Sequence, residues 1–317
     1  MTEQTVPEAP AVGEVTLESG AGGFGGVESQ AAAVGGITRQ TQFGNIRRRF
    51  LRNKLALLGL VMVTIVFLTA IFAPMIATHP PKAQDLTITL QTPSSEHWLG
   101  TDELGRDVFS RIVYGTRIAV SVGLASIFLA LVIGVILGSI SGYVGKVWDT
   151  LIMRIADVFF AFPLIIGAVV IILVVGRGVA PVILAIGLFS WATVARLLRS
   201  SILSIRESEY VEAARSLGAS KWRIVTRHVL PNSMAPVLVY AMVSVATAIV
   251  AQASLSYLGV GVPPDVPDWG NMIAAGQKFF GFKDYLWFFP SMAVVFTVLG
   301  FVFVGDGMRD ALDPRLR

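Results

Sequence analysis

A charged stretch of the chain, residues 207–232, lies between two long apolar segments. Four of its less polar side chains recur at helical spacing: Tyr210, Ala213, Ala214 and Leu217. This spacing predicts a short helix with one apolar face, and Glu212 in its first turns complements the positive end of the helix dipole. Gly218 is expected to end this helix, because glycine tolerates the left-handed backbone that follows many helices. A short helix with such a face could bind in a groove of another protein.

A second short helix is predicted from Lys221, because Ser220 can cap its first turn. We expect it to end near Leu230, since Pro231 lacks the N–H that a helix interior requires. The stretch therefore reads as a helix–glycine–helix unit whose small residues permit close approach of a partner. An ordinary amphipathic loop is the alternative.

Composition places this unit in a membrane protein. The chain has 317 residues, of which 54% are hydrophobic and 15% charged, and its mean hydropathy is +0.70. Soluble domains carry about 25% charged residues. The absence of cysteine excludes disulfides and thiolate chemistry, and the net charge of +4 requires no nucleic-acid partner.

The elements that position the charged stretch are apolar runs long enough to cross a bilayer, for which about 20 helical residues suffice. We expect an all-α membrane protein with six transmembrane helices, at 55–77, 118–142, 151–175, 179–198, 235–258 and 285–305. Assigned to this topology, 18 of the 25 Lys and Arg residues share one side and 7 lie on the other. The excess of basic residues marks the cytoplasmic side, so both termini and residues 207–232 are predicted there.

Four regions follow from this topology. Residues 1–42 read as a disordered cytoplasmic tail, because so few apolar residues cannot offset the entropy of ordering. Residues 43–78 hold a basic segment and the first span, and residues 79–116 form an external segment. Residues 117–317 form the core, with five further spans and the charged stretch between the fourth and fifth.

Two external segments combine aromatic, proline and paired charged residues, at 97–107 and 263–271. This composition predicts an ordered external rim rather than a loose loop. Its candidate residues are Asp102, Arg106, Asp107, Trp269 and Asn271.

The outer half of the fifth span is unusually polar, with Gln252, Ser254 and Ser256 as candidates to line a transport path. Polar groups facing lipid cost free energy, so these side chains should face water or neighbouring helices. Interhelical hydrogen bonds are the alternative to a path. In the third span Asp157, beside Arg154, is expected to form a structural ion pair at the inner interface. A role in proton-driven transport, which needs ionisable residues within the membrane, is the alternative.

Catalytic chemistry is not visible in the sequence. The phosphate-binding pattern G-x-x-x-x-G-K-[ST] is missing, so ATP hydrolysis by this chain is not expected. His79, His97 and His228 are scattered along the chain, and we predict neither a metal site nor a nucleophile with its base. Energy for transport must then come from a partner.

The pattern Glu212-Ala213-Ala214, Gly218, Leu230-Pro231 resembles the EAA motif of permease subunits of binding-protein-dependent ABC importers, with His228 where the family has Ile. Residues 99–107 resemble the LGTDxLGRD signature of the C-type subunit of the dipeptide and oligopeptide branch, and residues 263–271 resemble another run of that branch. The resemblance covers about residues 43–317.

The resemblance implies a permease of the prokaryotic cytoplasmic membrane that forms a heterodimer with a B-type permease. Two ATPase subunits or domains would bind residues 207–232, with ATP and Mg²⁺ on those partners and no cofactor on this chain. An external solute-binding protein would deliver di- or oligopeptides. Nickel, glutathione or another small solute is the alternative cargo, and a secondary carrier working alone or a membrane scaffold is the alternative class.

Overall fold

The computed structural model describes residues 42–312, and residues 45–312 belong to one packed unit. The predicted tail at 1–42 therefore lies almost wholly outside the described residues. Within the described range the chain is helical, apart from turns and a single isolated bridge between Thr101 and Asp107.

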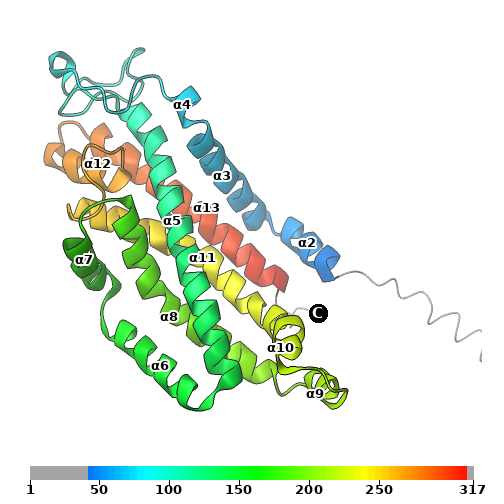
Figure 1. Cartoon of the computed structure of the whole chain (residues 1–317). Helices are drawn as coiled ribbons and strands as arrows, with labels where there is room; N and C mark the ends of the chain where they lie inside the picture. The colour runs from blue at the N-terminus through cyan, green and yellow to red at the C-terminus, as the bar shows by residue number, and fades with distance from the viewer. Residues whose placement is uncertain (1–41, 313–317) are drawn as a thin grey trace, which may run out of the picture. The chain divides into compact units, whose positions relative to one another are not determined.

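Figure 1 shows the order of the helices along the chain. The long helices are α3 (Lys54–Ile71), α5 (Val108–Ser139), α8 (Val179–Ile205), α11 (Leu230–Tyr257) and α13 (Tyr285–Leu312). The shorter α-helices are α2 (Gln42–Arg52), α4 (Ala73–Ile76), α6 (Lys146–Ala161), α7 (Leu164–Val175), α9 (Glu209–Ser216), α10 (Lys221–Ile224) and α12 (Trp269–Gly276). Two π-helical turns, Ile140–Val144 and Val225–Val229, and two 3₁₀ turns, Leu86–Ile88 and Gln277–Phe279, complete the set.

The core forms where α5, α8, α11 and α13 pack together, and α3 covers α13. Five described helices are long and apolar enough to span a membrane, and the bent pair α6–α7 brings the number to six if it counts as one span. The six-span prediction agrees with this arrangement.

The third span, predicted at 151–175, consists of two helices rather than one. Its two halves, α6 and α7, meet at an angle of 93°. Phe162 is extended and precedes Pro163. A residue before proline avoids the helical conformation, and proline lacks the N–H to continue the ladder, so the helix breaks there.

Pro231 does not end a helix as predicted, because the chain continues from α10 into α11. The π-helical turn at Val225–Val229 shifts the hydrogen-bond register just before Leu230. Pro231 then falls in the first turn of α11, where its missing N–H is not required. α10, the π-helical turn and α11 thus form one continuous helical segment that leads from the charged stretch into the membrane.

The second span begins earlier than predicted, at Val108 rather than near residue 118. Asp107 caps α5, since its side chain accepts a hydrogen bond from the Ser110 N–H. The last nine residues assigned to the external segment, 108–116, are therefore the first turns of α5.

Gly134, Gly138 and Gly142 lie along the contact between α5 and α8, continuing into the π-helical turn. A Cβ added at Gly138 would lie 2.8 Å from the carbonyl oxygen of Ala195, and one at Gly134 would lie 2.5 Å from the Cβ of Val194. Small residues at this spacing allow helix backbones to approach closely within a bilayer.

Replacing Gly138 with leucine should destabilise the protein by about 1–3 kcal/mol, because the obstructing atoms are backbone and cannot move alone. Thermal unfolding in detergent, followed by tryptophan fluorescence, measures the loss. Val132→Leu is the matched control, because Val132 is exposed on the same helix. Equal unfolding temperatures for Gly138→Leu and the control would contradict the close contact.

Two opposite ends of the helical unit carry the irregular segments (Figure 1). α4, the segment 77–107 and α12 gather at one end. α9 and α10 lie at the other end. The predicted rim and the predicted docking unit are therefore separated by the length of the spans.

Candidate functional site

The helix–glycine–helix unit is anchored on the membrane helices by its buried side chains. Val211 of α9, Ile224 of α10 and Val229 of the following turn belong to one apolar cluster with residues of α8 and α11. Each of these three side chains is at most 1% exposed. Val211 was not singled out from the sequence, because one inward residue in so short a helix produces no periodic pattern.

The predicted apolar stripe points away from that anchor. Leu217 is 89% exposed and Tyr210 is 46% exposed, while Ala213 is exposed and Ala214 half-buried. Glu212 is also exposed. Trp222 of α10, which is not part of the predicted stripe, is 76% exposed. Large apolar groups left uncovered in this way mark interaction surfaces.

Gly218 adopts the predicted left-handed conformation, with φ of +79°. It joins α9 to α10, and Ser220 caps α10 by accepting a hydrogen bond from the Arg223 N–H at 3.3 Å. The carbonyls at the end of α9 are satisfied within the turn, since Ala213 accepts from Leu217 and Ala214 accepts from Ala219. The left-handed backbone of Gly218 therefore lies within the four-residue turn that joins α9 to α10.

Charged contacts connect this end of the unit to α6 and to the turn after α5. The Arg206 guanidinium donates to the Gly142 carbonyl at 3.2 Å. Arg199 of α8 makes two hydrogen bonds to Asp149 of α6, and Ser141 donates to the same carboxylate. These contacts tie the end of α8, from which the chain enters the helix–glycine–helix unit, to α6 and to the turn after α5.

Asp157 forms an ion pair, as predicted, but its partner is Arg196 and not the neighbouring Arg154. Its carboxylate accepts a hydrogen bond from Arg196 of α8 at 2.6 Å. Long side chains from neighbouring helices reach such a carboxylate as easily as a residue on its own helix, and sequence spacing does not distinguish them.

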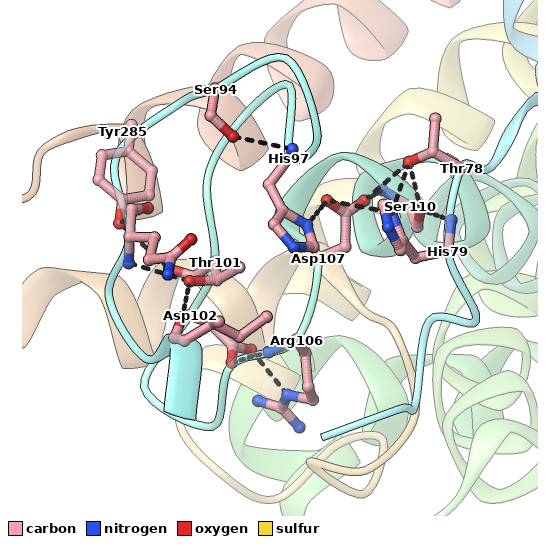
Figure 2. Close-up of polar contacts among 12 residues, drawn as sticks. Thr78, His79, Ser94, His97, Thr101, Asp102, Arg106, Asp107, Ser110 and Tyr285 are labelled. Carbon is pink, nitrogen blue, oxygen red and sulfur yellow. Dashed lines mark hydrogen bonds and ion pairs between the residues drawn. The ribbon is translucent and has the colours of Figure 1, made fainter. Parts of the chain in front are cut away.

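At the opposite end, Asp107 organises the predicted rim (Figure 2). One carboxylate oxygen accepts from the Ser110 N–H at 2.8 Å, and the other contacts the His97 Nδ1 at 2.9 Å. Thr78 donates to the same carboxylate at 3.4 Å. The carboxylate is buried, so it joins the end of α4, the 94–97 turn and the start of α5.

The remaining rim residues also lie in ordered contacts. Asp102 accepts from the Arg106 Nε at 2.7 Å. The buried Trp269 donates to the Ile112 carbonyl at 3.0 Å, and Asn271 donates to the Val262 carbonyl at 2.8 Å. The five predicted residues thus lie at one polar end of the helical unit.

The candidate path residues separate into two groups. Gln252 and Ser256 are buried and hydrogen-bonded to each other, and Gln252 donates to the Asp268 carboxylate. Burial raises the pKa of Asp268, and hydrogen bonds from Asn271 and Gln252 oppose that effect. Ser254 is half-buried, and it lies in a surface groove with Tyr257.

A cysteine at Ser254 should react with a water-soluble methanethiosulfonate reagent at least about tenfold faster than a cysteine at Ser256, because only Ser254 is reachable. The chain contains no cysteine, so single substitutions can be measured without background. If Ser254→Cys stays unreactive in every nucleotide state of the complex, it does not line the path.

Two family models match different parts of the chain. Residues 134–317 match the family described as binding-protein-dependent transport system inner membrane component. Residues 41–93 match the N-terminal transmembrane domain of oligopeptide transport permease C.

Curated relatives extend over most of the chain. The dipeptide transport system permease protein DppC of Alkalihalophilus pseudofirmus is 41% identical over 84% of this chain and 88% of its own. The oligopeptide transport system permease protein OppC of Bacillus subtilis is 42% identical over 85% and 88%. The glutathione transport system permease protein GsiD of Pectobacterium atrosepticum is 39% identical over 88% and 93%.

Among solved structures, a chain of the inward-facing MetNI methionine ABC transporter has a TM-score of 0.53 at 21% identity. The similarity covers 64% of this chain and 97% of that chain, and it shows a shared fold. Together with the family match over more than half of the sequence, these findings make the chain a multi-pass inner-membrane permease of the binding-protein-dependent transport family.

Proposed function

We propose that this chain is the C-type permease subunit of an ATP-driven importer of di- or oligopeptides in a prokaryotic cytoplasmic membrane. It forms a heterodimer with a B-type permease, and the pair encloses the peptide path within the lipid bilayer. An external solute-binding protein docks at the rim. The names of the dipeptide and oligopeptide relatives support this cargo.

The observation that carries the proposal is the exposed apolar face of α9 and α10 on an anchored base. Val211 and Ile224 fasten the unit to the membrane helices, while Tyr210, Leu217 and Trp222 remain uncovered. The α9–α10 unit packs on the membrane helices with one face and leaves its other face exposed. This arrangement suits the transfer of motion from a protein that docks on the exposed face. Two ATPase subunits or domains are the proposed occupants, one on this chain and one on its B-type partner.

ATP and Mg²⁺ bind to those ATPases in this proposal, and no cofactor binds to this chain. The lack of a Walker-type phosphate loop in the full sequence is consistent with that division. ATP-driven closure of the ATPases would move α9, and the Arg206 and Arg199 contacts would carry the motion to α5, α6 and α8.

A second cargo is favoured by the glutathione relatives, which match the chain at 39% identity. Glutathione is itself a small peptide, so the same path could serve it. Nickel or another small solute is a further alternative, and a secondary carrier working alone is the alternative class.

The test is uptake by the reconstituted complex in proteoliposomes that contain the binding protein. We expect ATP-dependent accumulation of labelled peptide, lost when the ATPase subunits are omitted. Uptake that persists without the ATPases would overturn the proposal in favour of a secondary carrier. Accumulation of glutathione but not of longer peptides would replace the cargo and keep the mechanism.

A further inference from the structure

Two of the three histidines, which appeared scattered in the sequence, meet at the rim. The ring centroids of His79 and His97 lie 4.5 Å apart, with the rings tilted by 33° (Figure 2). Glu96 lies beside them, and one ligand atom from each of the three residues falls within 4.8 Å of the others. Two imidazoles and a carboxylate are a ligand set that proteins use for zinc.

The buried carboxylate of Asp107 orients the pair. Because an ionised carboxylate only accepts, its 2.9 Å contact requires the hydrogen of His97 to sit on Nδ1, which leaves the Nε2 lone pair available. Asp107 also lies 3.8 Å from the Nδ1 of His79. Carboxylates behind metal-binding histidines fix the ring and its tautomer in this way.

The backbone that carries His79 is held as well. Its N–H donates to the Ser110 hydroxyl at 3.0 Å, and its Nδ1 lies 3.0 Å from the Thr78 hydroxyl. Pro80 and Pro81 follow directly, and Arg111 donates to the Pro81 carbonyl at 3.2 Å. The position of His79 is therefore set by α5, while Glu96 is exposed and can turn toward the rings.

We propose that His79, Glu96 and His97 bind one transition-metal ion of the zinc class, on the face of the rim predicted to be external. Ligand atoms around a tetrahedral Zn²⁺ lie about 3.4 Å apart, given bonds of about 2.0–2.1 Å. The ligand atoms of the three residues lie within 4.8 Å of one another, and rotation of the exposed Glu96 can bring its carboxylate to the spacing that the ion requires. Mg²⁺ and Ca²⁺ do not suit this site, because these ions prefer oxygen ligands to imidazole nitrogens.

Metal bound there would fasten two segments together, the chain after α4 and the 94–97 turn. Both already contact the start of α5, through Ser110 and Asp107. The fourth coordination position would remain for water or for a donor atom from a docked molecule. This inference does not depend on the cargo or on the ATPases.

The test uses the full-length protein in detergent, purified without a histidine tag. Zn²⁺ is titrated against a chromophoric indicator, and we expect one saturable site per chain in the presence of excess Mg²⁺. His79→Gln and Glu96→Gln should each weaken binding by about tenfold or more. His228→Gln is the matched control and should bind as the wild type does, since His228 lies in the turn between α10 and α11.

Thermal unfolding without metal shows whether each variant is folded, and Zn²⁺ should raise the unfolding temperature of the wild type but not of His79→Gln. Unchanged affinity in either the His79→Gln or the Glu96→Gln variant would overturn the three-residue site. Absence of saturable Zn²⁺ binding to the wild type would overturn it too.

Discussion

Gly218→Val should abolish ATP-driven uptake while the protein still folds and reaches the membrane. Gly218 has φ of +79°, and a side chain in the left-handed region costs about 1–2 kcal/mol, with β-branched residues among the worst. An added Cβ would meet no atom within 4 Å, so the penalty is conformational rather than steric. The chain can relieve it by turning α9 away from α10, which displaces the exposed face.

The matched control is Gly218→Asn, because asparagine enters the left-handed region far more readily than valine. Uptake should fall in the order Gly, Asn, Ala, Val, while the unfolding temperature changes little, since the residue is exposed. Uptake in proteoliposomes and thermal unfolding separate the two effects. Wild-type uptake by Gly218→Val, or equal loss in Asn and Val variants, would refute the argument.

Asp107→Ala should cause the largest loss of stability among single changes at the rim, about 2–4 kcal/mol. The change removes the cap of α5, worth about 1 kcal/mol, and leaves the His97 ring without its acceptor in a buried position. We expect the rim to loosen and both uptake and binding-protein-stimulated ATP hydrolysis to fall. Asp107→Asn should lose roughly half as much, because the amide oxygen can still cap the helix.

Glu103→Ala is the control for that experiment. Glu103 belongs to the same rim, but its contact with Lys278 is 4.0 Å long and partly exposed, so its removal should cost under about 1 kcal/mol. Comparable unfolding temperatures for Asp107→Ala and Glu103→Ala would mean that Asp107 does not hold the rim together.

The membrane spans could be predicted from hydropathy, and their orientation from the distribution of charge. Apolar helices are stable in lipid, and charged residues remain in water. Two of the differences from the prediction occur at prolines. Pro163 breaks the third span, whereas Pro231 is accommodated by a π-helical turn. Both residues carry the same local penalty, and only the hydrogen-bond register of the preceding turn decides the outcome. That register is set by packing, so it was not readable from the sequence.

Some features of the candidate site could be predicted from the local sequence, and others depend on distant parts of the chain. The left-handed Gly218 and the Ser220 cap were predictable, because they depend on local backbone chemistry. The anchoring of Val211 depends on residues far away in the chain, as does the pairing of Asp157 with Arg196. The approach of His79 to His97 is likewise a consequence of α5 and its cap, which no spacing rule reveals.

The central claim is that α9 and α10 dock an ATPase, and site-specific cross-linking tests it most directly. Leu217→Cys, labelled with a photoreactive maleimide in the assembled complex, should yield an adduct that contains the ATPase subunit, because Leu217 is 89% exposed on the proposed face. Phe282→Cys, equally exposed in the loop before α13, should yield none. An active complex in which Leu217→Cys gives no ATPase adduct, or in which Phe282→Cys gives as much, would contradict the account.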